Sequence, residues 1–150
     1  MKAEIDQSGK IEQLNTHTVV ALANSVNFAI YISSKEKIKL YKALRTAVLR
    51  RRDQNALVFA TLVYLIIIKV GKRLDGVFID IEYSGKNDFI KEVIVKISNK
   101  DSYKLLPDIN FRLVGKSSKA HALGIDIYRK KDKTKAVVIK AEDVLKYIKF

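Results

Sequence analysis

A run of apolar residues at positions 56–68, ALVFATLVYLIII, places the strongest constraint on how this chain of 150 residues can fold. The run is shorter than the roughly 18 to 20 residues that a helix needs to span a membrane. We therefore expect a helix buried in a protein core, and no membrane partner. With 48% hydrophobic residues and no linker or low-complexity tract, the chain is expected to form one domain over residues 1–150.

Strands are expected before this helix. Residues 2–7, KAEIDQ, alternate apolar and polar side chains and predict a short strand. Residues 18–24 and 26–33, TVVALAN and VNFAIYIS, are rich in β-branched and aromatic side chains and are separated by a turn signal at Asn24-Ser25. They predict a β-hairpin.

An amphipathic helix should follow the hairpin, capped by Ser33 or Ser34 and continuing to Arg52. Its core-facing side is expected to contain Ile38, Tyr41, Leu44 and Val48. The polar residues 53–55 either bend this helix or separate it from the apolar run.

The second half of the chain alternates strand and helix patterns. The expected elements are a strand over 76–83, a helix over 87–100, a strand over 109–115, a helix over 117–131 capped by Ser117, a strand over 135–140 and a short helix over 141–150. Such alternation predicts an α/β fold, a mixed sheet flanked by helices.

The charge of the chain favours a polyanionic partner. Lys and Arg number 29 against 16 Asp and Glu, which leaves a formal net charge of +13. We expect nucleic acid rather than a membrane surface. The basic residues either form a solvated surface or contact phosphates. Candidates for phosphate contact are Lys39, Lys42, Arg45, Arg50, Arg51, Arg112, Lys116, Ser117 and Lys119.

The chain contains no cysteine, which excludes disulfides, thiolate zinc sites and a cysteine nucleophile. A metal site would have to use oxygen ligands, which suit Mg²⁺ or Mn²⁺. The first residues, MKAEIDQSGKIEQ, carry charges where a signal peptide needs an apolar segment, so a cytoplasmic location is expected.

Asp80 and Glu82 end an otherwise apolar strand pattern, VFIDIEY, and their side chains leave the same face because they are two residues apart. Val77, Ile79 and Ile81 would anchor the other face. Two carboxylates in one small volume raise each other's pKa unless a cation or basic neighbours compensate. The alternative is a solvated strand face with no further role.

Asp6 also ends a predicted strand. If that strand and the Asp80 strand are neighbours, Asp6 with Asp80 or Glu82 can hold one or two Mg²⁺ ions. Paired ions of this kind catalyse phosphodiester hydrolysis.

IDQSG, VFIDIEY and GKSSKAHALGID, in this order, resemble motifs of the ribonuclease H-like superfamily, in particular its Holliday-junction-resolvase-like branch, over roughly residues 1–131. The resemblance implies a mixed five-stranded sheet whose first three strands are antiparallel, here with a short C-terminal strand-helix extension. It also implies Mg²⁺-dependent cleavage of structured or hybrid nucleic acid. Asp6 matches the acid of the first strand, and either Asp80 or Glu82 matches the acid of the fourth.

The last helix departs from that pattern. Resolvase-like members carry an acid or His there, often followed three residues later by another acid. In this chain His121 is followed at that spacing by Gly124, and the nearest acid is Asp126. We expect His121 to complete the site, with Asp126 as the alternative.

Two functions remain open on these grounds. One is a metal-dependent nuclease that uses Asp6 and Asp80 or Glu82 as ligands and acts on DNA or an RNA–DNA hybrid. The other is a nucleic-acid-binding module of the same fold without the chemistry. The apolar C-terminal tail, VLKYIKF, also suggests a possible homodimer.

Overall fold

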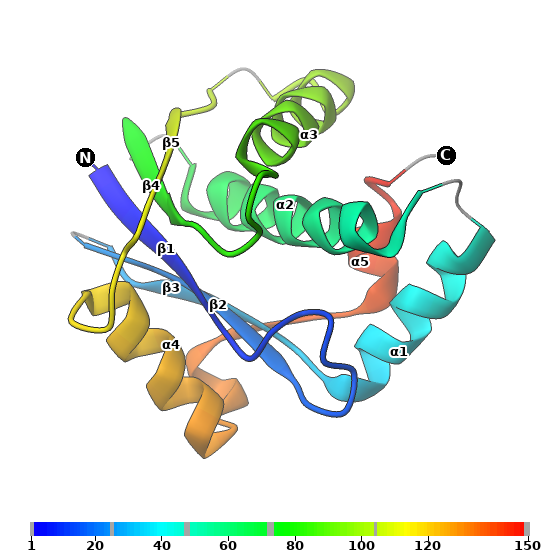
Figure 1. Ribbon diagram of the computed structural model, residues 1–150. Coiled ribbons are helices and arrows are strands. Elements are labelled where there is room, and N and C mark those ends of the chain that lie inside the picture. Colours follow the sequence, from blue (N-terminus) through cyan, green and yellow to red (C-terminus); the bar gives the residue numbers. More distant parts are fainter. Residues whose placement is uncertain (1, 25, 47–48, 72–73, 104, 149–150) are drawn as a thin grey trace.

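One mixed sheet of six strands organises the chain in this computed structural model, which describes residues 2–24, 26–46, 49–71, 74–103 and 105–148 (Figure 1). The strands are β1 (Lys2–Ser8), β2 (Thr18–Ala23), β3 (Phe28–Ile32), β4 (Gly76–Asp80), β5 (Asp108–Arg112) and β6 (Val137–Ile139). Their order across the sheet is β5-β4-β1-β2-β3-β6. The pairs β1–β2 and β2–β3 are antiparallel, whereas β1–β4, β4–β5 and β3–β6 are parallel.

The expectation of five strands is therefore wrong by one. The segment that we expected as a C-terminal extension supplies β6, which pairs with β3 through Ile30↔Val137 and Ile32↔Ile139. The predicted hairpin, the α/β class and the mixed sheet flanked by helices are confirmed.

Helices cover both faces of the sheet unequally. They are α1 (Ser34–Ala43), α2 (Arg51–Val70), α3 (Asn87–Lys100), α4 (Lys119–Lys130) and α5 (Ala141–Leu145). Figure 1 shows α4 on one side of the sheet and the other helices on the opposite side. Side chains therefore divide by alternation: Ile5 and Val20 enter the core beneath α2, whereas Val19 and Ala21 pack against Ile127 of α4.

Helix α2 is the central core helix, as the apolar run predicted. By length and composition alone it could cross a membrane, but 72% of its apolar window is buried inside the protein. Phe59, Leu62 and Ile66 have no exposed surface. This burial follows from a helix that is apolar on nearly all sides.

The junction between α1 and α2 differs from the prediction. Helix α1 ends at Ala43, a short 3-10 turn covers Leu44–Thr46, and residues 53–55 lie inside α2. Two of these polar residues connect α2 to the preceding segments by hydrogen bonds. The Tyr41 hydroxyl of α1 donates to Asn55 Oδ1 at 2.8 Å, and Gln54 Nε2 donates to the Leu44 carbonyl of the 3-10 turn at 3.2 Å. They stay in the helix because their side chains find buried partners there.

The core-facing side of α1 was also predicted wrongly in part. Tyr41 and Leu44 are buried as expected, but Ile38 is 46% exposed and Lys37 is buried in its place. Val48 lies outside the described residues. The Lys37 ammonium donates to the carbonyls of Lys10 and Gln13 and to Thr18 Oγ1, at 3.3, 2.7 and 2.9 Å, so its burial is compensated by hydrogen bonds.

Element ends differ from prediction by a few residues elsewhere. Strand β4 ends at Asp80, before Ile81 and Glu82, and β5 ends at Arg112. Helix α3 has the predicted bounds, 87–100. Helix α4 is capped by Ser118 rather than Ser117.

The described part of the C-terminal tail packs within its own chain. Val144 and Ile148 are buried, and the Tyr147 ring meets the Tyr64 ring edge-on at 5.5 Å. The last two residues of VLKYIKF, 149–150, lie outside the described residues.

Candidate metal centre

Three carboxylates meet where β1 and β4 approach their carboxyl ends. The two strands are parallel neighbours, and Ile5 pairs with Ile79, so Asp6 and Asp80 follow side by side. Glu82 comes two residues after Asp80, just beyond the strand. Ligand oxygens of Asp6, Asp80 and Glu82 all lie within 4.8 Å of one another, an arrangement that can hold a metal ion. All donors are carboxylate oxygens, which suit a hard cation.

The electrostatics of this cluster favour a cation. Burial raises the pKa of the Asp6 carboxyl; the hydrogen bond with His121 opposes this rise, and the charge of Asp80 adds to it. Burial raises the pKa of Glu82 to about 8, and the hydrogen bond and charge of Asp80 contribute. Without a cation the cluster therefore holds protons that exposed carboxylates lose, and a bound cation would stabilise the ionised forms.

His121 joins the cluster from α4. The Ser118 hydroxyl accepts a hydrogen bond from the His121 backbone N–H at 3.0 Å, which caps the helix beside the acids. The side chain reaches Asp6, and Nδ1 lies 2.8 Å from Oδ2. His121 is thus the residue of α4 that lies against the acids.

Asp126 lies elsewhere. Its carboxylate pairs with Lys130 at 2.9 Å and with Lys135 at 3.8 Å, and these partners lower its pKa. Asp126 does not line the cleft that contains the acids. A position five residues after His121 points to a different side of the helix, so Asp126 does not lie with the three acids in this structure.

Gly124, at the spacing where resolvase-like proteins often carry an acid, has a packing role. A Cβ at this position would lie 3.0 Å from Ser8 Oγ and 3.3 Å from the Ala21 side chain. The glycine lets α4 approach β1 and β2 closely. An acid would require the helix to move away from the sheet.

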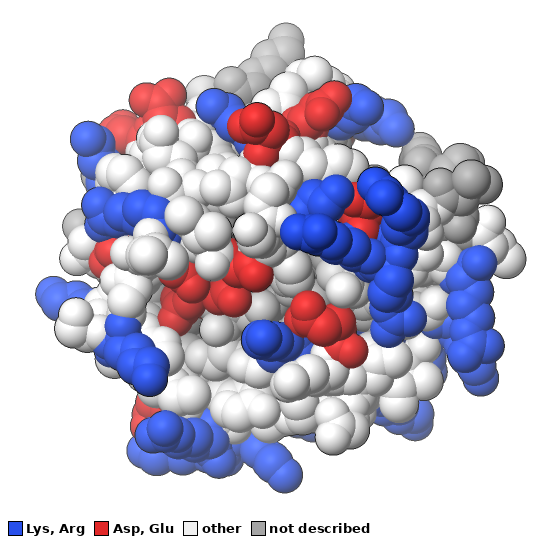
Figure 2. Space-filling view, viewed as in Figure 1, with Lys and Arg blue, Asp and Glu red and all other residues white. Residues whose placement is uncertain are grey.

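The acids open into a cleft of about 410 Å³. Its lining consists of Asp6, Gln7, Asp80, Glu82, Leu113, Gly115, Lys116 and His121. One wall is the 113–118 connection between β5 and α4, which is attached to the acids because the Val114 N–H donates to Asp80 Oδ1 at 2.9 Å. Figure 2 shows a patch of acidic atoms near the ends of β1 and β4, with Lys and Arg on several sides of it.

The candidate phosphate contacts fall into separate groups. Lys116 lines the cleft, and Ser117 and Lys119 follow it on the surface. Arg112 already has partners within the protein: its guanidinium pairs with the Glu4 carboxylate at 2.7 Å and lies 3.9 Å from the centre of the Phe78 ring.

The basic residues at the start of α2 border the loop that carries Glu82. Arg52 Nη2 donates to the Ser84 carbonyl at 2.5 Å, and Lys86 pairs with Asp53. Arg50 and Arg51 precede them, in contact with Asp53 and the Tyr41 ring respectively. On α1, Lys39 pairs with Glu36 at 3.2 Å and Lys42 is exposed; Arg45, in the 3-10 turn that follows α1, is exposed too. Arg52 thus joins the start of α2 to the loop that carries Glu82.

Sequence reasoning missed the residues that support Glu82. The Gln7 backbone donates a hydrogen bond to the Glu82 carboxylate. The Gln7 side chain lies 3.4 Å from the Tyr83 hydroxyl, which also reaches Glu12 at 3.5 Å. Gln7 follows Asp6 in the sequence, and Tyr83 follows Glu82. This adjacency to predicted ligands is the only feature of the sequence that points to them.

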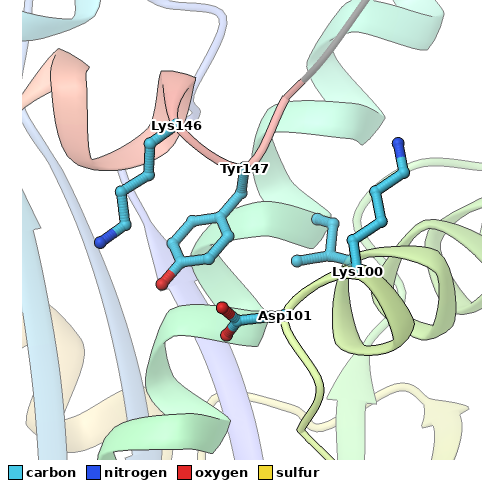
Figure 3. A pocket seen from close by; sticks show the side chains of 5 residues that line it. Lys100, Asp101, Lys146 and Tyr147 are labelled. Atoms are coloured by element: carbon cyan, nitrogen blue, oxygen red, sulfur yellow. The ribbon is translucent and has the colours of Figure 1, made fainter.

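A second hollow lies between the end of α3 and α5, and Figure 3 shows the side chains that line it. Its carboxylate, Asp101, accepts a hydrogen bond from the Tyr64 hydroxyl at 2.5 Å. Lys100 and Lys146 extend away from each other on either side of Tyr147 (Figure 3). The hollow therefore does not gather acids or converging cations, unlike the cleft at β1 and β4.

No family model, curated protein or solved structure matches the chain. What can be inferred about function rests on the cleft itself.

Proposed function

We propose that this protein is a metal-dependent nuclease of ribonuclease H-like fold that hydrolyses phosphodiester bonds of structured or hybrid nucleic acid in the cytoplasm. The observation that carries the proposal is the cleft in which Asp6, Asp80 and Glu82 meet and His121 contacts Asp6. Lys116 on its wall and the net charge of +13 favour a polyanionic substrate.

The strand directions support the fold assignment. The resemblance implies a mixed five-stranded sheet whose first three strands are antiparallel. Strands β1, β2 and β3 are antiparallel, and β4 and β5 extend the sheet from β1 in parallel. Strand β6 is then an addition at the opposite edge.

The three carboxylates would hold one or two Mg²⁺ or Mn²⁺ ions. Bound ions of this kind activate a water molecule for attack on phosphorus and stabilise the leaving oxygen. Asp6 is fixed by His121, Asp80 by the Val114 N–H and Glu82 by the Gln7 N–H, so each ligand is oriented by a neighbour.

His121 has a second task in this proposal. With Nδ1–H donated to an ionised Asp6, the neutral ring keeps its lone pair on Nε2. Nε2 can then accept a proton from the attacking water or, once protonated, return one to the leaving oxygen. Lys116 binds a phosphate of the substrate as a point charge.

Cleavage assays test the proposal directly. Branched DNA, duplex DNA and an RNA–DNA hybrid are incubated with the protein and Mg²⁺ or Mn²⁺, with EDTA as the metal-free control. We expect cutting that is lost in Asp80→Asn and Glu82→Gln. Asp126→Asn is the matched control, because this acid lies outside the cleft, and it should cut like wild type. No cutting by wild type, or equal cutting by all variants, would contradict the proposal.

A binding module of the same fold is the second candidate, and Gly124 favours it because that position has no room for an acid. In that case Asp6→Asn and Asp80→Asn bind nucleic acid as tightly as wild type or more tightly, since each removes a negative charge. No substrate in the panel would be cut.

A further inference from the structure

Leu113 is an unusual residue to find in the lining of an acidic cleft, because it is apolar and strongly exposed. Its exposed fraction is 79%, the largest among the large apolar residues that the structure describes. It lies in the 113–118 connection and lines the cleft with the three acids and Lys116. A leucine in such a place gains nothing from burial in its own chain. Its apolar surface is open to whatever enters the cleft.

The backbone around Leu113 is held in place. On one side the Arg112 carbonyl accepts a hydrogen bond from the Ile81 N–H at 3.2 Å. On the other side Val114 donates to Asp80 Oδ1, and the Val114 side chain is buried. The exposed side chain is therefore presented by a fixed backbone, directly attached to one of the acids.

Ile81 is the backbone neighbour of Leu113, but its side chain is not among those that line the cleft. The register that pairs Asp80 with Arg112 continues through the hydrogen bond of Ile81, so Ile81 and Leu113 are the next neighbouring positions. Ile81 is 37% exposed, although the alternation of its strand predicted an anchoring role. Leu113, whose exposed side chain lines the cleft with Asp80 and Glu82, is therefore the apolar step of the cleft.

We infer that this apolar step receives a nucleobase next to the phosphate that the acids engage, and that Leu113 is a specificity-determining residue. This inference rests on the proposed function. Nucleic acid offers the cleft phosphates for Lys116 and base faces for an apolar side chain. In a continuous duplex each base face is covered by its neighbours. A base can lie flat on the step only where stacking is interrupted, at a branch, a gap or an unpaired nucleotide.

The consequence is a preference for interrupted over continuous duplex. A base face that covers the exposed leucine side chain removes apolar surface from water, which contributes enough for about a tenfold change in binding or rate. The step thereby supplies selection by shape, because a base face is a feature of every nucleotide and carries little sequence information.

Kinetics on two substrates test the inference. One is a continuous duplex, and the other has the same sequence with a single unpaired nucleotide at the cut position. We expect Leu113→Ser to lower kcat/KM on the interrupted substrate about tenfold more than on the continuous one. Leu113→Phe should keep the preference. Leu105→Ser is the matched control, since Leu105 is an exposed leucine in the connection between α3 and β5. Equal losses on both substrates in Leu113→Ser would overturn the inference.

A binding measurement separates this inference from the proposed function. 2-Aminopurine, which becomes more fluorescent when it leaves the base stack, replaces the unpaired nucleotide, and the protein is added in EDTA so that no cutting occurs. Contact with the step should change the fluorescence with wild type and less with Leu113→Ser. If wild type cuts nothing but the fluorescence differs between wild type and Leu113→Ser, the nuclease proposal is wrong and the proposed base contact of Leu113 is retained. If wild type cuts and the two proteins give the same signal, the step fails alone.

Discussion

Asp6 connects the two halves of the proposed chemistry at the scale of single residues. It faces Asp80 on the neighbouring strand and His121 on α4, and these neighbours have opposite effects on its pKa. A carboxylate so placed can hold a cation and orient an imidazole simultaneously. The role of His121 can be separated from that of Asp6 because the histidine has two ring nitrogens with different tasks.

Two substitutions of His121 distinguish positioning from proton transfer. In His121→Asn the side-chain amide can replace Nδ1 as the donor to Asp6 but has no group equivalent to Nε2. We expect kcat to fall by about 10²-fold in both His121→Asn and His121→Ala, because both lack the proton-accepting nitrogen. Recovery of wild-type kcat by His121→Asn would mean that the histidine only positions Asp6. The measurement is single-turnover cleavage in Mn²⁺ over a range of pH.

Glu82 should make the metal-free protein sensitive to pH. Its raised pKa, about 8, means that the folded state binds a proton more tightly than the unfolded state. The resulting stability is present below the ordinary glutamate pKa and is lost as pH rises through about 8. In EDTA at pH 9, Glu82→Gln should therefore have a higher Tm than wild type.

Added Mn²⁺ should reverse that order. Mn²⁺ stabilises the ionised cluster of wild type and raises its Tm. The rise in Tm should be smaller for Glu82→Gln, which has one carboxylate fewer. Thermal unfolding in EDTA and in Mn²⁺ gives both comparisons. A Glu82→Gln protein that loses Tm in EDTA and gains as much from Mn²⁺ as wild type would show that Glu82 is not a ligand.

At the scale of elements, the site depends on how closely α4 approaches the sheet. The glycine at position 124 lets α4 pack closely against Ser8 and Ala21, and α4 also brings His121 to Asp6. The helix is therefore a positioning element as well as a cover for the sheet.

Gly124→Ala should push α4 away from the sheet. We expect the free energy of unfolding to fall by about 1 to 3 kcal/mol, because the new methyl group would lie 3.0 Å from Ser8 Oγ and 3.3 Å from the Ala21 side chain, closer than ordinary packing. Gly76→Ala is a suitable control, since its Cβ would meet its nearest neighbours at an ordinary 3.6 Å. Urea unfolding of both variants checks the expectation, and equal effects would contradict it.

Helix α1 is attached to the 9–17 connection by a buried cation. Burial lowers the pKa of Lys37 to about 8, so between pH 8 and 10.5 the unfolded chain binds more protons than the folded one. Stability therefore rises with pH in this window, by about 3 kcal/mol in total. Urea unfolding at pH 7.5, 9 and 10 should show this rise in wild type and in Lys35→Met, an exposed control on the same helix. Lys37→Met should lack the rise, and parallel curves for all three proteins would refute the assignment.

At the scale of the whole molecule, local patterns predicted most elements and distant contacts decided the rest. Periodicity correctly gave the hairpin, α3 and the burial of α2, because each pattern is set by neighbours in sequence. It chose Ile38 over Lys37 because the acceptors that make Lys37 tolerable lie in another segment. It also missed the pairing of β6 with β3, which joins segments about a hundred residues apart.

The site followed the same division. Asp6, Asp80 and Glu82 could be chosen as ligands because each ends a strand pattern. The rotation of α4 about its axis decides which of His121 and Asp126 lies near the acids. The exposed surface of Leu113 marks it as a residue of the cleft. Local sequence spacing determines neither the rotation nor the exposure. The proximity of the three acids could thus be predicted because strand register alone brings them together.

The net charge of +13 predicts a strong salt dependence of nucleic-acid binding. Each phosphate contact by a basic side chain releases counterions, so Lys116→Gln should weaken binding similarly for all sequences and reduce the slope of log K against log salt by about 1. Lys96→Gln on α3, a lysine paired with Glu92, is the matched control and should leave the slope unchanged.

Lys39→Gln tests whether the basic side of α1 takes part: a reduced slope would extend the interface to α1, and an unchanged slope would confine it to the cleft and the start of α2. Fluorescence anisotropy in EDTA at several salt concentrations provides these slopes, and an unchanged slope in Lys116→Gln would remove Lys116 from the phosphate contacts.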